Sequence, residues 1–194
     1  MDNTVGSQQQ NIIIGTLLGD GFLERNGKFV RLVIDHSSNQ SLYVRWKGKH
    51  LCDFKPTIKE KSRFDARTGK YQQHTILRTR TSPDLERYYT LFYENGIKRV
   101  PEELPMILNG QNLAIWIMDD GYKRNDCNAL RINSQSYDRQ EHEIIVSALS
   151  QLSINAKIQK HKKSFVTYIP SASMSRLRKA VKPYMMKSME YKIA

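Results

Sequence analysis

One stretch of the chain decides the fold: residues 112–121 read NLAIWIMDDG. Here an apolar run with the length of a short helix ends at two aspartates and a glycine. Residues 12–21, IIIGTLLGDG, have the same form, and an aromatic residue follows the glycine in both copies. Asp20 and Asp120 are separated by about half of the 194-residue chain. The repeat predicts two related halves, each with one carboxylate at the end of an apolar helix.

The segments around the two motifs follow one order. In the first half the patterns predict a helix at 8–20, an Asn-Gly turn, a strand at 28–37, a helix at 39–54, a hairpin of strands 57–63 and 72–81, and a helix at 84–94 capped by Ser82 and Pro83. In the second half they predict a helix at 111–120, a strand at 129–134, a helix at 140–151, a hairpin of strands 156–162 and 164–169, and a helix at 173–181. The connector is 95–109. This order predicts an α+β protein with α-β-β-α-β-β-α twice, in halves 1–105 and 106–194.

Basic residues are concentrated at similar places in the two halves. Residues 45–80 contain eleven Lys/Arg and three acids, and residues 157–192 contain ten Lys/Arg and one acid. The whole chain has a formal charge of +12 and a pI near 9.7. Most charge runs are simply solvated surface, but two matching blocks of this size favour a polyanionic partner, and a nucleic acid above all.

Composition also excludes several classes of protein. The mean hydropathy is −0.60 and no long apolar run occurs, so we expect no membrane span. Residues 1–10 are polar and predict no signal or transit peptide, consistent with an organelle-encoded or prokaryotic intracellular protein. Cys52 and Cys127 could form a disulfide, but free thiols are the better expectation, and zinc ligation is not indicated. The histidines are scattered and predict surface or satisfied core positions: His36, His50, His74, His142 and His161.

The repeated carboxylates suit a metal-dependent reaction on phosphodiesters. Hydrolysis of such a bond needs a divalent cation that polarises the phosphate and activates water. Mg²⁺ prefers oxygen ligands and keeps several waters, so one carboxylate per site suffices when a phosphate adds another ligand. A single Asp-Gly is most simply a helix stop. Two in register, each behind an apolar helix, favour a functional role for Asp20 and Asp120.

With this element order and both motifs, the chain resembles the LAGLIDADG homing endonucleases. It is similar to their single-chain type, of which the yeast mitochondrial omega-intron endonuclease is an example. The resemblance rests on residues 113–121, on GIKRVP at 96–101, on NSQS at 133–136 and on MEYK at 189–192, and it covers nearly the whole chain. It implies two saddle-shaped antiparallel sheets that lie on DNA and a central pair of helices.

The resemblance also implies the active-site residues. Asp20 and Asp120 hold Mg²⁺, for which Mn²⁺ or Ca²⁺ can substitute in binding, and the carbonyls of Gly19 and Asp119 are further ligands. Lys98 and Lys192 end the two halves and become catalytic candidates. Because Asp119 and Asp120 are adjacent, either could be the metal-binding carboxylate of the second motif. We choose Asp120, because it precedes the glycine as Asp20 does.

The helix pair needs small residues where the two backbones meet. Gly15 and Gly19 are four residues apart and lie on one helical face. The second copy departs from this pattern, because Ile115 and Asp119 stand at the corresponding positions. We therefore expect large residues of one helix to pack into glycines of the other.

Strands that enter the major groove would carry the DNA contacts, some to bases and others to phosphates. The candidates in the first half are Arg25, Lys28, Arg31, Lys59, Lys61, Arg63, Arg67, Lys70, Gln72, His74, Arg78 and Arg80. In the second half they are Lys123, Arg131, Asn133, Lys157, Lys160, Lys162 and Lys163.

Three functions follow from this scaffold. The first is a monomeric homing endonuclease that cuts both strands of a long asymmetric duplex and leaves short 3′ overhangs, as the resemblance implies. The second is an RNA maturase whose partner is its own intron RNA. The third is a DNA-binding protein without catalysis. Both motif aspartates and both lysines are present, which favours the first.

Overall fold

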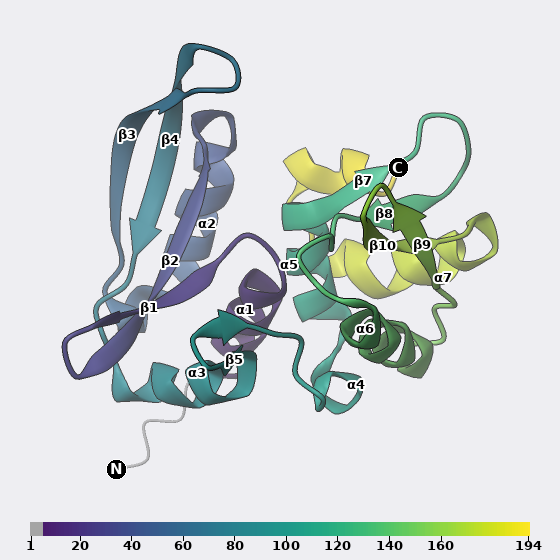
Figure 1. Cartoon of the computed structure of the whole chain (residues 1–194), viewed down its shortest axis with the longest axis horizontal. Coiled ribbons are helices and arrows are strands. Elements are labelled where there is room, and N and C mark those ends of the chain that lie inside the picture. Colours follow the sequence, from purple (N-terminus) through teal and green to yellow (C-terminus); the bar gives the residue numbers. More distant parts are fainter. Residues whose placement is uncertain (1–5) are drawn as a thin grey trace. The chain divides into compact units, whose positions relative to one another are not determined.

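A computed structural model describes residues 6–194, so the predictions about residues 1–5 lie outside the described part (Figure 1). The chain forms two compact units. The first comprises the described residues up to Ile12 together with Asp20–Leu91, and the second comprises Ile13–Gly19 together with Phe92–Ala194. Helix α1 (Ser7–Leu18) therefore contributes its first half to one unit and its second half to the other.

The first unit is built on a four-stranded antiparallel sheet. Its strands are β1 (Phe22–Asn26), β2 (Phe29–Ser37), β3 (Thr57–Asp65) and β4 (Lys70–Arg78), in the order β1-β2-β4-β3. The predicted turn forms, but its two-residue loop is Gly27-Lys28, because Asn26 pairs with Phe29. Gly27 has φ of +75°, which suits glycine at the first position of such a loop. The strand prediction was therefore one residue too long at Lys28.

Helix α2 (Ser41–His50) covers one face of this sheet (Figure 1). Gly48 allows the close approach, because a Cβ there would lie 3.0 Å from Leu77 Cδ1 and 3.3 Å from Ile58 Cδ1. Short 3-10 turns flank the helix at Ser38–Gln40 and Cys52–Phe54. The predicted helix at 39–54 is present, but only its central part, Ser41–His50, is α-helical.

The predicted cap before the next helix is confirmed, and the predicted helix end is wrong. The Ser82 hydroxyl accepts a hydrogen bond from the backbone N–H of Asp84, and Pro83 opens a 3-10 turn that leads into α3 (Glu86–Phe92). The helix stops before Glu94, because Asn95 and Gly96 have φ of +50° and +80° and form a hairpin turn. The hairpin strands are β5 (Tyr93–Glu94) and β6 (Ile97–Lys98), and α4 (Leu104–Ile107) follows in the connector.

The second unit repeats the helix and sheet order. Helix α5 (Gly110–Asp120) is followed by β7 (Gly121–Lys123), β8 (Leu130–Ile132), α6 (Arg139–Gln151), β9 (Lys157–His161), β10 (Ser164–Ile169) and α7 (Ser171–Val181). The sheet is antiparallel in the order β7-β8-β10-β9. Capping boxes begin α5 at Asn109 and α6 at Asp138. The chain ends in 3-10 turns at Lys182–Tyr184 and Lys187–Lys192.

Apolar residues from the helices and from one face of each sheet form the core. Residues 113–118 of α5 are fully buried, as are Leu32 and Ile34 in the first sheet and Leu130 and Ile132 in the second. The predicted α+β class with two antiparallel sheets is confirmed. Among residues 6–194, no helix is long and apolar enough to span a bilayer.

Candidate functional site

The end of α1 packs against α5 within the second unit. A Cβ atom at Gly15 would lie 2.4 Å from the backbone oxygen of Asn112 and 2.6 Å from Cβ of Ile115. A Cβ atom at Gly19 would lie 2.6 Å from Cβ of Asp119. Gly15 and Gly19 thus meet the corresponding residues of the second motif, and the expected packing of large residues into glycines is confirmed.

The second motif ends in a sharp change of structure. Helix α5 continues through Asp120, and β7 begins at Gly121 without a loop. A Cβ atom at Gly121 would lie only 2.5 Å from the backbone oxygen of Ile117, so this turn requires glycine. The helix of the first motif ends two residues earlier: α1 stops at Leu18, and the Asp20 side chain is 43% exposed. Asp120 is half-buried and Asp119 is buried.

Both candidate lysines bind backbone oxygens at the motif ends. Lys98 Nζ donates to the Gly19 carbonyl at 2.8 Å. Lys192 Nζ donates to the carbonyls of Asp119 at 2.8 Å and Met118 at 2.6 Å. Carbonyls in the last turn of a helix lack intrahelical partners and carry its negative dipole end, so an ammonium group stabilises them. The two carbonyls predicted as metal ligands are therefore the ones that the two lysines contact.

Tyr137 is a further residue at these helix ends that the sequence analysis missed. Its buried phenol donates to the Leu18 carbonyl at 3.0 Å. Burial raises the pKa of Tyr137, and the carboxylates of Asp120 and Glu141 raise it further. The phenol therefore stays neutral and remains a donor. No local signal marks it, because Leu18 lies 119 residues away along the chain.

His36 lies beside the first carboxylate in the first unit. Its Nδ1 is 3.5 Å from Asp20 Oδ2, and its side chain is only 3% exposed. The imidazole packs edge-on against Tyr43, with ring centroids 5.6 Å apart. A surface or a satisfied core position was expected for this histidine; it is buried, and its contact with Asp20 was not expected. The signal available was its place on the buried face of β2, the strand that runs antiparallel to β1 and returns toward the motif.

The residues at the motif ends fit a hard divalent cation. Asp20 and Asp120 offer carboxylate oxygens, and Gly19 and Asp119 offer carbonyl oxygens, which are the donors that Mg²⁺, Mn²⁺ and Ca²⁺ accept. Asp20 is exposed enough to keep water on a bound ion. His36 adds a nitrogen close to Asp20 that softer metals would accept.

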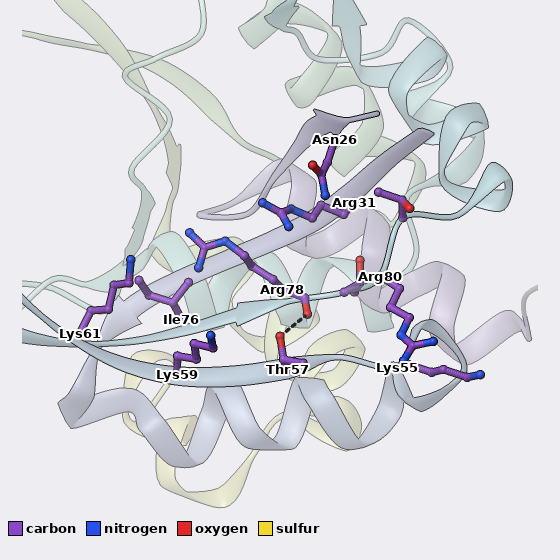
Figure 2. A pocket seen from close by; sticks show the side chains of 11 residues that line it. Asn26, Arg31, Lys55, Thr57, Lys59, Lys61, Ile76, Arg78 and Arg80 are labelled. Carbon is purple, nitrogen blue, oxygen red and sulfur yellow. Dashed lines mark hydrogen bonds between the residues drawn. The ribbon is translucent and has the colours of Figure 1, made fainter. Parts of the chain in front are cut away.

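The strand register places most first-half DNA-binding candidates on one face of the first sheet. We call this the basic face; it carries Arg31, Lys59, Lys61, Arg63, Lys70, Gln72, His74 and Arg78. The opposite face carries Leu77 and Ile34 and is the one that α2 covers. Figure 2 shows Arg31, Arg78, Lys59 and Lys61 around a hollow on the basic face, which Asn26 and Arg80 also line.

The other first-half candidates lie elsewhere. Arg25 is on the opposite face, where it pairs with Glu86 at 3.2 Å and stacks over the Tyr89 ring. Lys28 occupies the β1–β2 turn, and Arg67 occupies the β3–β4 turn. These positions are exposed but lie outside the basic face.

The second sheet separates its candidates in the same way. Arg131 and Lys157 share a face with Tyr168, and Lys160 is on the other face opposite Phe165. Lys123 ends β7 opposite Leu130, and Asn133 follows β8 as an exposed residue. Lys162 and Lys163 form the tip of the β9–β10 hairpin. Tyr122, Gln159 and Tyr168 also lie on the Arg131 face and were not among the predicted candidates.

Comparison with known proteins gives a consistent result. The sequence pattern of the LAGLIDADG DNA endonuclease family matches residues 10–177. The DNA endonuclease I-ChuI of Chlamydomonas applanata is 30% identical over 96% of this chain and 94% of its own length. The cytochrome b mRNA maturase bI2 of Saccharomyces cerevisiae is 29% identical over all of this chain and 49% of its own length. The homing endonuclease I-WcaI, solved bound to its DNA recognition sequence, superposes with a TM-score of 0.91 at 22% identity, over 99% of this chain and 88% of that one.

Proposed function

Because the chain belongs to the LAGLIDADG DNA endonuclease family, we propose that it is a site-specific homing endonuclease. In this proposal it hydrolyses both strands of a long, asymmetric duplex with Mg²⁺ and leaves short 3′ overhangs. Its halves are residues 1–105 and 106–194, each with one motif. The DNA-bound state of I-WcaI and the name of I-ChuI support double-stranded DNA as the substrate.

One observation carries the proposal: the ends of the two motifs contain the same functional groups. Each has an aspartate before a glycine, and next to that aspartate a backbone carbonyl that accepts a hydrogen bond from a lysine. The lysines come from segments 79 and 73 residues away. A helix stop needs neither a carboxylate nor a distant lysine, so this duplication supports two equivalent reaction centres, one for each DNA strand.

Within this proposal the chain's own residues orient the reacting groups. Asp20 and Asp120 would hold the divalent cations, with the carbonyls of Gly19 and Asp119 as further ligands. A bound cation supplies Lewis acidity toward the phosphate and lowers the pKa of water. Lys98 and Lys192 fix the carbonyls in position and add positive charge where the pentacoordinate transition state at phosphorus develops negative charge. Tyr137 holds the end of α1 through Leu18.

The cleavage proposal is tested with purified protein and a randomised duplex library in Mg²⁺, with EDTA as the matched control. Sequencing of the cut ends should give one preferred site with 3′ overhangs. The same protein is incubated with candidate intron RNA, because the similarity to a cytochrome b mRNA maturase makes splicing assistance the second candidate function. Cleavage without splicing supports the endonuclease, splicing without cleavage supports the maturase, and selective binding alone indicates a DNA-binding protein.

We expect DNA affinity to fall steeply with salt. The basic face and the second sheet displace counterions from phosphates, so the slope of log K against log[salt] should be about −4 or steeper. Fluorescence anisotropy with a labelled duplex between low and physiological salt measures this slope. Lys59→Gln should make it shallower by about 1. A wild-type slope shallower than about −3 would contradict a long duplex site.

We also expect one chain to bind each duplex, on a site without dyad symmetry. The two halves are already joined covalently, and their sheets present different side chains: Arg31 and Asp35 on β2 against Arg131 on β8. Different side chains read different bases. Analytical ultracentrifugation of the complex should show one 22.6 kDa chain per duplex. Two chains per duplex, or a palindromic selected site, would overturn this expectation.

A further inference from the structure

Three carboxylates lie on the basic face: Glu24, Asp35 and Asp65. Asp65 ends β3 and pairs with Arg67 of the adjoining turn at 3.5 Å, whereas Glu24 and Asp35 lie among the cations of the strands. The register places Glu24 of β1 directly opposite Arg31 of β2, and Asp35 of β2 lies two strands away from Arg63 of β3. An acid on a DNA-binding surface weakens its attraction to phosphate, so a carboxylate at such a position requires another explanation.

Glu24 holds two arginines. Its Oε1 lies 2.6 Å from Arg31 Nε and 2.5 Å from the terminal nitrogen of the same guanidinium. The same oxygen is 3.7 Å from Arg78 Nε. Both arginine side chains are only 28% exposed. Figure 2 shows their guanidinium groups next to each other at the hollow.

Asp35 holds an arginine and a histidine in the same manner. Its Oδ2 is 2.6 Å from Arg63 Nη1, and its Oδ1 is 2.8 Å from His74 Nδ1. Asp35 is 16% exposed, so its ion pairs are partly shielded from solvent. Glu24 and Asp35 therefore each connect two cationic or potentially cationic side chains from neighbouring strands.

The lysines of the basic face differ from these residues. In the described part of the chain, no ion pair or hydrogen bond involves the side chains of Lys59, Lys61 or Lys70. A flexible ammonium can follow a phosphate wherever it lies, whereas a guanidinium fixed by a carboxylate presents its donors in one orientation. Bidentate recognition of guanine N7 and O6 needs that fixed orientation, and pre-ordering lowers the entropy cost of binding.

The second sheet contains a different arrangement. Arg131 Nε donates to the neutral Gln159 Oε1 at 2.9 Å. The register places Tyr122, Lys157, His161, Ser164, Val166 and Tyr168 on the same face, without a carboxylate. On the sheet faces that carry Arg31 and Arg131, an arginine paired with an acid occurs only in the first sheet; the Arg124–Asp126 pair of the second unit lies after the end of β7.

We infer that Glu24 and Asp35 are specificity-determining positioning residues. They orient Arg31, Arg78 and Arg63 to read guanines, while the lysines of the basic face contact phosphates. The inference rests on the proposed function, which supplies the duplex. Arg78 and His74 are four residues apart on β4, or about 13 Å at the rise of a strand. The two groups should therefore read positions about four base pairs apart in one half of the site.

The test compares Glu24→Gln and Asp35→Asn with Glu60→Gln, an acid of the same sheet on the opposite face. Affinity for the selected duplex and for an unrelated duplex is measured in Ca²⁺ by anisotropy. The two basic-face variants should lower the ratio of these affinities by about 10- to 100-fold. Their affinity for unrelated DNA should stay equal or rise, because a negative charge is removed. Glu60→Gln should leave the ratio unchanged.

A second variant, Arg31→Lys, keeps the positive charge and removes only the paired N–H donors of the guanidinium. Arg31→Lys should relax the preference at one guanine position in a selection from a randomised library, with the salt slope unchanged. Lys59→Gln should weaken both duplexes equally. If Glu24→Gln and Arg31→Lys both keep the wild-type ratio and base preference, the inference is overturned, and the acids act only by repulsion. If the proposed function itself is wrong, the wild-type protein will cut no duplex in Mg²⁺, which distinguishes that outcome from failure of the inference about Glu24 and Asp35.

Discussion

Replacing Asp20 or Asp120 with asparagine is expected to lower the rate of double-strand cleavage by about 10³-fold or more. A divalent cation supplies several kcal/mol of transition-state stabilisation, and about 1.4 kcal/mol corresponds to a tenfold change in rate. Asparagine keeps the size of the side chain but loses the charge that holds the cation. DNA affinity should change less than about threefold, because a single carboxylate at a helix end contributes little to a multi-phosphate interface.

Cleavage of a supercoiled plasmid that carries the selected site measures this effect, since nicked and linear products separate on a gel. Asp119→Asn is the matched control. Asp119 is buried against Gly19, whereas Asp120 is half-buried and precedes the glycine. If Asp119→Asn loses cleavage and Asp120→Asn retains it, the metal ligand is one position earlier than proposed. Cleavage near the wild-type rate in Asp20→Asn would contradict the metal assignment altogether.

The local parts of this architecture were predictable because short-range chemistry determines them. The run at 112–121 predicts a buried helix that ends at an aspartate, and α5 ends at Asp120. Ser82 and Pro83 predict a cap, and the hydroxyl makes that bond. The predicted end of α3 at Glu94 was wrong because the Asn95-Gly96 turn, whose residues have positive φ angles, pairs Tyr93 and Glu94 with Ile97 and Lys98 in a hairpin.

The site itself was less predictable, because its contacts join distant segments. Lys98 was selected by resemblance, and nothing near it in the sequence indicates that Gly19 accepts its hydrogen bond. Glu24 and Asp35 were missed because a count of charges treats an acid among bases as a loss. The strand register places both acids beside arginines. The register could not be predicted, because the sequence located the strands only to within a few residues.

Gly15→Ala is expected to destabilise the protein by about 3 kcal/mol, at the upper end of overpacking costs. The added methyl group would lie 2.4 Å from the Asn112 carbonyl and 2.6 Å from Ile115 Cβ, so α1 and α5 must move apart. For a chain of this length the melting temperature should fall by roughly 10 °C. Thermal unfolding followed by circular dichroism measures the change.

Gly6→Ala provides the control, because no atom lies within 4 Å of a Cβ at that position, and its melting temperature should stay close to that of the wild type. Ile115→Ala in the Gly15→Ala background removes the contact with Ile115 Cγ2 at 3.0 Å but keeps the Cβ atom of residue 115 and the Asn112 carbonyl oxygen. The double variant should therefore remain destabilised. Full recovery would mean that the Cγ2 contact alone sets the helix spacing. An unchanged melting temperature in Gly15→Ala would contradict the close helix contact, and with it the need for glycine at this position.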